Sequence, residues 1–183
     1  MQKITIQKGH NINISGLASR EFASAPTQKF VSLSPQDFNY IKPKLLVKEG
    51  DHVSLGDALF FDKINPDVKW PSIAAGTISK IVYGERRAVL DIIIEVDDNK
   101  EKTSQIINER NLSTKEYVKN FIQNNNLWPF FTQRPFNKVV DPKDSPKCII
   151  VSLADSSPLA NDLSFSLSDK KDNIVSALSN IKK

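Results

Sequence analysis

The chain has 183 residues, of which 39% are hydrophobic, and its 25 basic and 21 acidic residues leave a formal net charge of +4. This size allows a sizeable core in one or two domains, while the intermixed charges lack the clustered basic stripe of a nucleic-acid-binding protein. No apolar run approaches the roughly 18 residues of a membrane helix, and the N-terminus has no long apolar segment of the signal-peptide type. We therefore expect no membrane span, no nucleic-acid partner and, by default, a cytoplasmic location.

Residue types that build metal and redox sites are scarce. Cys148 is the single cysteine, which excludes an internal disulfide and a multi-cysteine iron–sulfur site. It lies in the apolar run 147–151, so we interpret it as a small buried residue. His10 and His52 are the two histidines and are far apart in the sequence. We predict neither a metal site nor a catalytic triad.

The first 44 residues alternate short apolar patterns with polar segments, which is typical of edge strands joined by loops. We predict strands around Ile4 and Ile6, around Ile12 and Ile14 and over 30–33, a loop over 15–26 and a turn over 35–38.

Residues 45–96 carry one motif twice, each copy with an apolar run, a turn at a glycine followed by an acidic residue, and a second apolar run. The turn glycines are Gly50 and Gly84. Glycine supplies the positive φ that other residues avoid, so each copy predicts a strand, a tight turn and a strand. Because so short a repeat buries its apolar face only against its twin, we predict a flattened barrel or sandwich of two related hairpins.

The end of the second copy, residues 89–96, alternates in a way that predicts a half-buried strand. One of its faces is wholly apolar: Leu90, Ile92, Ile94 and Val96. Between the two copies, we predict a projecting loop over 65–71. In that loop Trp70 either packs against the barrel edge or anchors a ligand or a partner.

Residues 97–102 form a charge run, which is the predicted domain boundary. Beyond it, Ser113 and Glu116 predict a capping box for a helix that ends at three asparagines, 124–126. Residues 127–136 then form a dense aromatic and proline segment with one arginine. Such a segment would suit a flat ligand with a carbonyl group or a neighbouring subunit, or its rings fill the seam beside the barrel.

The last part of the chain predicts the beginning of a Rossmann-like domain. Residues 147–153 form an apolar run typical of a buried parallel strand, and Ser168 is the expected cap of a helix with an apolar stripe. The strand that would complete this βαβ unit is missing, so we expect an N-terminal piece of a longer polypeptide. Residues 85–183 contain no glycine, so the fingerprints that bind dinucleotides and nucleoside triphosphates are absent.

The repeat itself resembles the biotinyl/lipoyl-type barrel-sandwich hybrid, through residues 47–53 with Gly56 and Leu59. A narrower resemblance comes from short motifs spread along the chain: Lys8-Gly9, Asp62-Lys63, Asn65-Pro66, the turn 84–87, Trp128-Pro129 and residues 133–137. With these motifs most of the chain resembles the A subunit of the sodium-translocating NADH:quinone oxidoreductase.

The resemblance implies an α+β protein, with a barrel-sandwich hybrid domain over 1–98 and, over 99–183, a helical linker and the first part of a Rossmann-like α/β domain. It implies a peripheral subunit on the cytoplasmic face of the bacterial inner membrane, which docks on other subunits of a sodium-pumping reductase and contributes to quinone interaction. It implies no cofactor in this chain, with NADH, FAD, FMN and iron–sulfur on other subunits and quinone as the substrate. We expect the chain alone to be inactive.

The candidate contacts with quinone or with other subunits are aromatic and arginine side chains. They are Trp70, Arg86, Arg87, Phe131, Arg134 and Phe136.

Two alternatives stay open. The C subunit of an RNF-type electron-transport complex shares the barrel, but it is expected to carry cysteine-rich cluster motifs. A lipoyl or biotin carrier would hold its modified lysine, here Lys63, at the tip of a tight hairpin. In this chain a proline-containing segment follows Lys63 and the next glycine is Gly76, so we interpret Lys63 as an ordinary solvated lysine.

Overall fold

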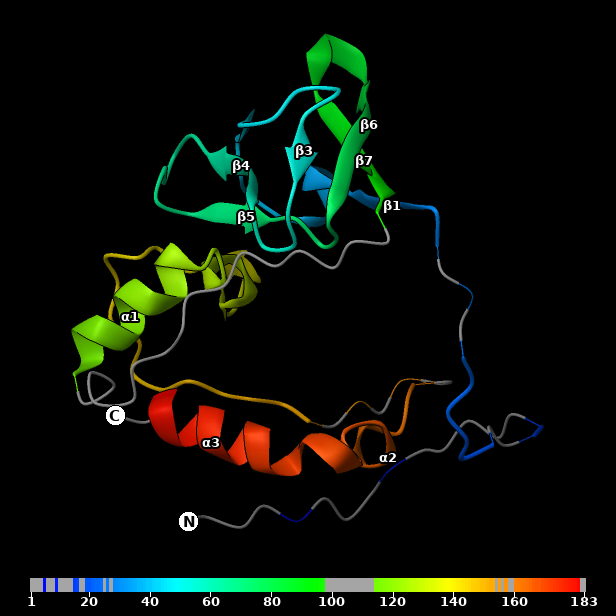
Figure 1. Cartoon of the computed structure of the whole chain (residues 1–183). Coiled ribbons are helices and arrows are strands. Elements are labelled where there is room, and N and C mark those ends of the chain that lie inside the picture. The colour runs from blue at the N-terminus through cyan, green and yellow to red at the C-terminus, as the bar shows by residue number, and fades with distance from the viewer. Residues whose placement is uncertain are drawn as a thin grey trace. The chain divides into compact units, whose positions relative to one another are not determined.

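The computed structural model of the chain describes residues 5, 9, 15–16, 19–24, 26, 28–97, 114–153, 155, 157 and 160–181 (Figure 1). The chain forms two compact units: one comprises Pro26–Lys147 with Ser179–Lys183, and the other comprises Met1–Ala25 with Cys148–Leu178. The strands predicted around Ile4, Ile6, Ile12 and Ile14 lie outside the described residues, as does the charge run beyond Asp97, so the boundary at residue 98 stays a prediction.

Two antiparallel sheets build the larger unit. One sheet has the order β1-β7-β6-β3 and consists of β1 (Phe30–Leu33), β7 (Val89–Val96), β6 (Gly76–Tyr83) and β3 (His52–Val53). The other has the order β2-β4-β5 and consists of β2 (Pro43–Leu45), β4 (Ala58–Asp62) and β5 (Lys69–Pro71). A single turn of 3₁₀ helix, Pro35–Asp37, follows β1 where the sequence predicted a turn.

The second copy of the repeat forms the predicted hairpin. Strands β6 and β7 pair with Ile78 opposite Ile94 and Ile81 opposite Ile92. Ile92 and Ile94 are fully buried, which confirms the half-buried strand. The conformation of the turn differs from the prediction, because Gly84 has a φ of −96°. A Cβ there would lie 2.9 Å from the Leu90 side chain, so glycine at this position leaves room for that residue.

The first copy does not fold into an equivalent hairpin. Strand β2 pairs with β4 in one sheet, while β3 pairs with β6 in the other. The turn at Gly50, whose φ is +89°, lies against β6: the Gly50 amide donates to the Ile78 carbonyl at 2.8 Å and the Ile78 amide donates to the Asp51 carbonyl at 2.8 Å. Residues 52–53 pair with β6, whereas the Gly56 amide donates to the Ser72 carbonyl at 3.0 Å, so the backbone groups of this segment find partners on two other segments instead of extending β2. The predicted sandwich is confirmed, but the first copy spans both sheets.

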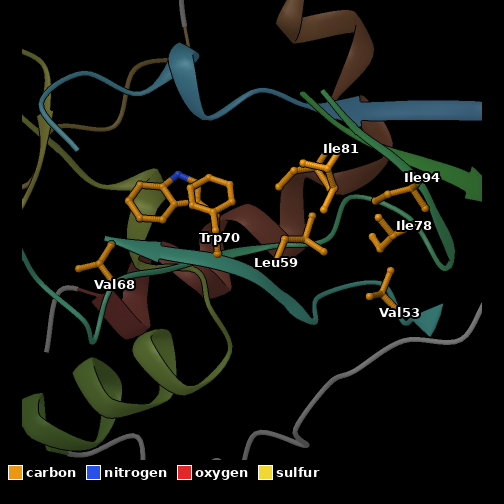
Figure 2. Close-up of a cluster of buried hydrophobic side chains, with 9 residues drawn as sticks. Val53, Leu59, Val68, Trp70, Ile78, Ile81 and Ile94 are labelled. Atoms are coloured by element: carbon orange, nitrogen blue, oxygen red, sulfur yellow. The ribbon is translucent and has the colours of Figure 1, made fainter. Parts of the chain in front are cut away.

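The core lies between the two sheets and takes side chains from both, as in a β-sandwich (Figure 2). Its buried members are Val53, Leu59, Phe60, Val68, Trp70, Ile78, Ile81, Ile92 and Ile94. Trp70 is 1% exposed and stacks on Phe60 with ring centroids 4.9 Å apart. It belongs to β5, so part of the predicted projecting loop is a strand that pairs with β4 and buries its central residue.

A helix and a small hairpin complete the larger unit. Helix α1 (Lys115–Asn124) ends at the predicted asparagines, but its cap is Thr114, whose side chain accepts from the Tyr117 amide at 3.3 Å. The predicted cap, Ser113, lies outside the described residues. A 3₁₀ helix, Trp128–Phe130, then leads to β8 (Thr132–Gln133) and β9 (Lys138–Val139). Trp128 packs against the core and donates to the Val140 carbonyl at 2.8 Å, so this segment is attached to the sandwich.

The described part of the smaller unit contains α2 (Leu163–Ser166), a 3₁₀ helix (Ser168–Lys170) and the beginning of α3 (Lys171–Ile181). The buried strand predicted over 147–153 is wrong: this run forms no strand, Cys148 is exposed, and Ile150 is 84% exposed. A parallel strand needs neighbours for its backbone groups, and the part of the unit that the structure describes supplies none. Ser168 is the first residue of the 3₁₀ helix and its N-cap position is held by Leu167, contrary to the prediction.

Candidate functional site

The larger unit is hollowed by a groove whose lining comes from the segment before β2, from the end of β4 and the loop that follows it, and from the β8–β9 hairpin and the residues just after it. Its volume is about 480 Å³, which falls within the range of roughly 300–1,000 Å³ for small-molecule sites. Three apolar side chains of its lining each expose more than half of their surface: Tyr40, Ile64 and Phe136. Exposed aromatic side chains recur in ligand and partner sites.

Backbone conformation holds one of these rings in place. Tyr40 has a φ of +63°, and a bulky residue adopts such a left-handed conformation only where its surroundings enforce it. Near it, the buried carboxylate of Asp62 accepts from the amides of Lys42 at 2.9 Å and Ile64 at 3.1 Å. Asp62 thus fixes the two chain segments that form one wall of the groove.

The polar groups of the groove include amide, ammonium and carboxylate side chains. The lining also includes Asn39 and Asn65, which carry amide donors, and Lys138 and Asp141, which carry opposite charges. Among the described lining residues there is no histidine, serine or cysteine, so a nucleophile paired with an imidazole base is absent there. Two exposed rings beside hydrogen-bond donors suit a flat ligand that carries carbonyl oxygens.

A second hollow of about 420 Å³ lies beside the turn between β6 and β7. Its cations are Lys42, Lys63 and Arg87, and its apolar lining includes Phe38, Ile41 and Val89. Lys63 is exposed, as expected for a solvated lysine, and its amide donates to the Lys42 carbonyl at 2.9 Å.

The structure separates the six candidate contacts instead of gathering them in one site. Phe136 lines the groove and Arg87 lines the second hollow, next to Arg86 in the same turn. Phe131 is half-buried against Trp128, with ring centroids 5.9 Å apart, and Arg134 is exposed in the turn between β8 and β9.

Trp70 lies in the core and presents no surface to a ligand or partner. Its indole Nε1 is a buried donor without a partner among the described residues.

Sequence reasoning missed Tyr40 and Lys138, which line the groove with Phe136. The sequence around Tyr40 shows only a turn, and the left-handed φ that turns its ring outward is a product of tertiary context. Lys138 directly follows the aromatic and proline segment 127–136, and no pattern in the sequence singled it out.

A metal site and a membrane-spanning helix are two further features for which the described residues give no support. No group of three or more histidine, cysteine or acidic side chains converges there to hold a metal, and no described helix is long and apolar enough to cross a membrane. His52 lies on the surface with its Nε2 2.9 Å from a carboxylate oxygen of Asp97.

Two family profiles match this chain. The profile described as the NqrA N-terminal barrel-sandwich hybrid domain matches residues 4–97, and the one described as the NqrA second alpha/beta domain matches residues 113–183. The first match covers the sandwich described above, including both hollows except for the part that the β8–β9 hairpin supplies to the groove.

Curated relatives are named as the A subunit of the Na(+)-translocating NADH-quinone reductase. One from Pseudomonas aeruginosa (strain UCBPP-PA14) is 35% identical over 161 residues, covering 87% of this chain and 36% of the relative. One from Glaesserella parasuis serovar 5 is 33% identical over 177 residues, which cover 96% of this chain and 40% of the relative. One from Marinomonas sp. (strain MWYL1) is 35% identical over 181 residues, which cover 97% of this chain and 40% of the relative. The chain thus spans 36–40% of the length of these relatives. On the profile matches, the chain belongs to the NqrA family.

Proposed function

We propose that this chain works as a cofactor-free subunit of a sodium-translocating NADH-quinone reductase, in which it docks on other subunits and contributes to quinone interaction. The relatives' names and the family membership support the assignment to this complex. NADH, FAD, FMN and iron–sulfur would reside on other subunits. In this proposal the chain is peripheral, on the cytoplasmic face of the bacterial inner membrane.

The observation that carries the quinone part is the groove rimmed by Tyr40 and Phe136. Both rings are about two-thirds exposed, at 68% and 65%, and both line the same 480 Å³ space. A quinone ring is flat and apolar with two carbonyl oxygens, so it stacks on such rings and accepts from the amides of Asn39 or Asn65 or from the Lys138 ammonium.

The test is a photoreactive quinone applied to the assembled reductase, with the labelled residues mapped by mass spectrometry. We expect label within residues 39–41, 62–68 or 136–141 of this chain. Label confined to other subunits would refute the quinone part.

A paired variant checks the same point kinetically. Y40L/F136L should raise the KM for quinone with little change in kcat, because stacking contributes to binding of the ring. The matched control is Y83L, which removes a 49% exposed ring of the same unit that lines neither hollow. An unchanged KM in Y40L/F136L, or an equal rise in Y83L, contradicts the proposal.

A further inference from the structure

The turn between β6 and β7 holds two arginines in conformations that favour other residues. Arg86 and Arg87 have φ values of +54° and +60°, and the Ala88 amide donates to the Glu85 carbonyl at 3.1 Å. Positive φ at both central residues is the pattern of a type I′ turn, where asparagine followed by glycine is strongly preferred. The chain therefore places charge at the tip of this hairpin (Figure 1) against the local backbone preference.

The hollow beside this tip gathers positive charge over an apolar lining. Lys42, Lys63 and Arg87 come from three different segments, and none of the described residues that line the hollow is acidic. Four described acidic residues lie within two residues of the lining in the sequence without lining the hollow: Asp37, Asp62, which accepts from backbone amides, Glu85 in the turn itself, and Asp91 in β7. An anion that enters the hollow thus meets three cations and no lining carboxylate.

The apolar part of the lining is recessed. Phe38, Ile41 and Val89 are partly buried and pack against the sandwich core, so they present a pocket for one inserted side chain. A lipid surface is flat and favours apolar side chains that project outward, and a neutral quinone gains little from three cations. A protein segment with an apolar anchor and flanking carboxylates matches both the recess and the charge.

We propose that the β6–β7 turn and this hollow form the docking site for an acidic segment of another subunit. An apolar side chain of that segment fills the recess, and its carboxylates bind Lys42, Lys63 and Arg87, with Arg86 at the rim. The inference rests on the proposed function, because it names the chemistry of one partner in the assembled reductase.

The first test places a photoreactive benzoylphenylalanine at Ala88, which is exposed and lines the hollow, in the assembled reductase. We expect a crosslink to an acidic segment of another subunit. A lipid or quinone adduct, a crosslink to a neutral or basic segment, or no crosslink overturns this inference. If the complex assembles and stays active without that crosslink, the proposed function survives; if the chain is absent from the active complex, both fail.

The second test is R86N/R87G, which removes both charges and supplies the residues that the turn prefers. We expect the melting temperature of the chain to rise by roughly 2–8 °C, and the salt concentration that releases half of the chain from the complex to fall at least about twofold. The control K69Q/K115Q also removes two positive charges, from exposed lysines outside the hollow. It should leave the salt concentration for half release unchanged. A higher melting temperature with unchanged release, or a lower melting temperature, overturns the inference.

Discussion

Gly76 lies against the backbone of Glu95 so closely that a Cβ on Gly76 would overlap with the Glu95 carbonyl oxygen. Both residues sit in the paired strands β6 and β7, and the Glu95 backbone is held there by its ladder. We predict that G76A lowers the free energy of unfolding by at least ~2 kcal/mol, because the strands must separate to admit the methyl group. Urea unfolding followed by far-UV circular dichroism measures the loss.

The matched control for this prediction is the same substitution at Gly84 in the same hairpin. A Cβ there meets side-chain atoms of Leu90, the nearest at 2.9 Å, and a half-buried leucine can shift to another rotamer. G84A should therefore cost about 1 kcal/mol or less. Equal losses for the two variants would show that the backbone contact at Gly76 is not decisive.

Trp70 combines tight packing with an unpartnered polar group. Its ring stacks on Phe60, while its Nε1 is buried without a hydrogen-bond partner among the described residues. W70F keeps most of the ring and removes the unpartnered donor, whose burial costs roughly 1–3 kcal/mol. We expect W70F to lower the free energy of unfolding by no more than ~1.5 kcal/mol and W70A by ~3–5 kcal/mol.

Urea unfolding by circular dichroism compares the two tryptophan variants without relying on tryptophan fluorescence. W70F should also leave the KM for quinone unchanged in the assembled reductase, because the ring is 1% exposed. A loss in W70F as large as in W70A would show that the indole N–H has a favourable partner in solution.

One carboxylate oxygen of Asp62 accepts hydrogen bonds from the backbone amides of Lys42 and Ile64. D62A leaves both amides without their acceptor and should lower the free energy of unfolding by ~2 kcal/mol or more. D62N retains a side-chain oxygen that accepts the same bonds, so the loss should be smaller by at least ~1 kcal/mol. Thermal unfolding of the two variants gives the comparison, and the ranking D62N worse than D62A would refute this role.

Local patterns predicted strands from their own sequence, both β7, whose partner β6 is close in the chain, and β1, which pairs with the distant β7. The alternation at Ile92 and Ile94 predicted the buried face of β7 correctly, since alternate residues of a strand lie on the same face. The pairing of β3 with β6 was not predictable in this way, because a two-residue strand has no periodicity of its own and its partner is set by long-range backbone hydrogen bonds. The exposed run 148–153 makes the same point: apolar composition predicts burial only where neighbouring strands exist.

The candidate site residues also differ in how far residue type alone could identify them. Residue type was enough to select Phe136 and Arg87, which line the two hollows. Tyr40 was not selected as a candidate because its φ of +63° depends on tertiary context. Trp70 was selected but is buried, because aromatic residues serve binding and packing equally well.

The carboxylate of Asp162 caps helix α2. The Ser164 hydroxyl donates to this carboxylate, as do the Phe165 and Ser164 amides, and these bonds with the nearby Arg20 hold its pKa below the ordinary 3.8. Because the folded pKa is the lower one, the cap stabilises α2 fully above the unfolded value, and this contribution is lost as the pH falls through the folded pKa. In a carboxyl-carbon NMR titration we expect the midpoint of Asp162 below 3.8.

Removing one donor tests the cause of that shift. S164A should move the Asp162 midpoint upward, because it deletes the hydroxyl that contributes most to the lowered pKa. The matched control is S166A, since the Ser166 hydroxyl bonds to the Asn161 side chain and the Asp162 carbonyl instead of the carboxylate. A midpoint at or above 3.8 in the unmodified chain, or equal shifts in S164A and S166A, would show that the Ser164 hydroxyl does not set the charge state of this cap.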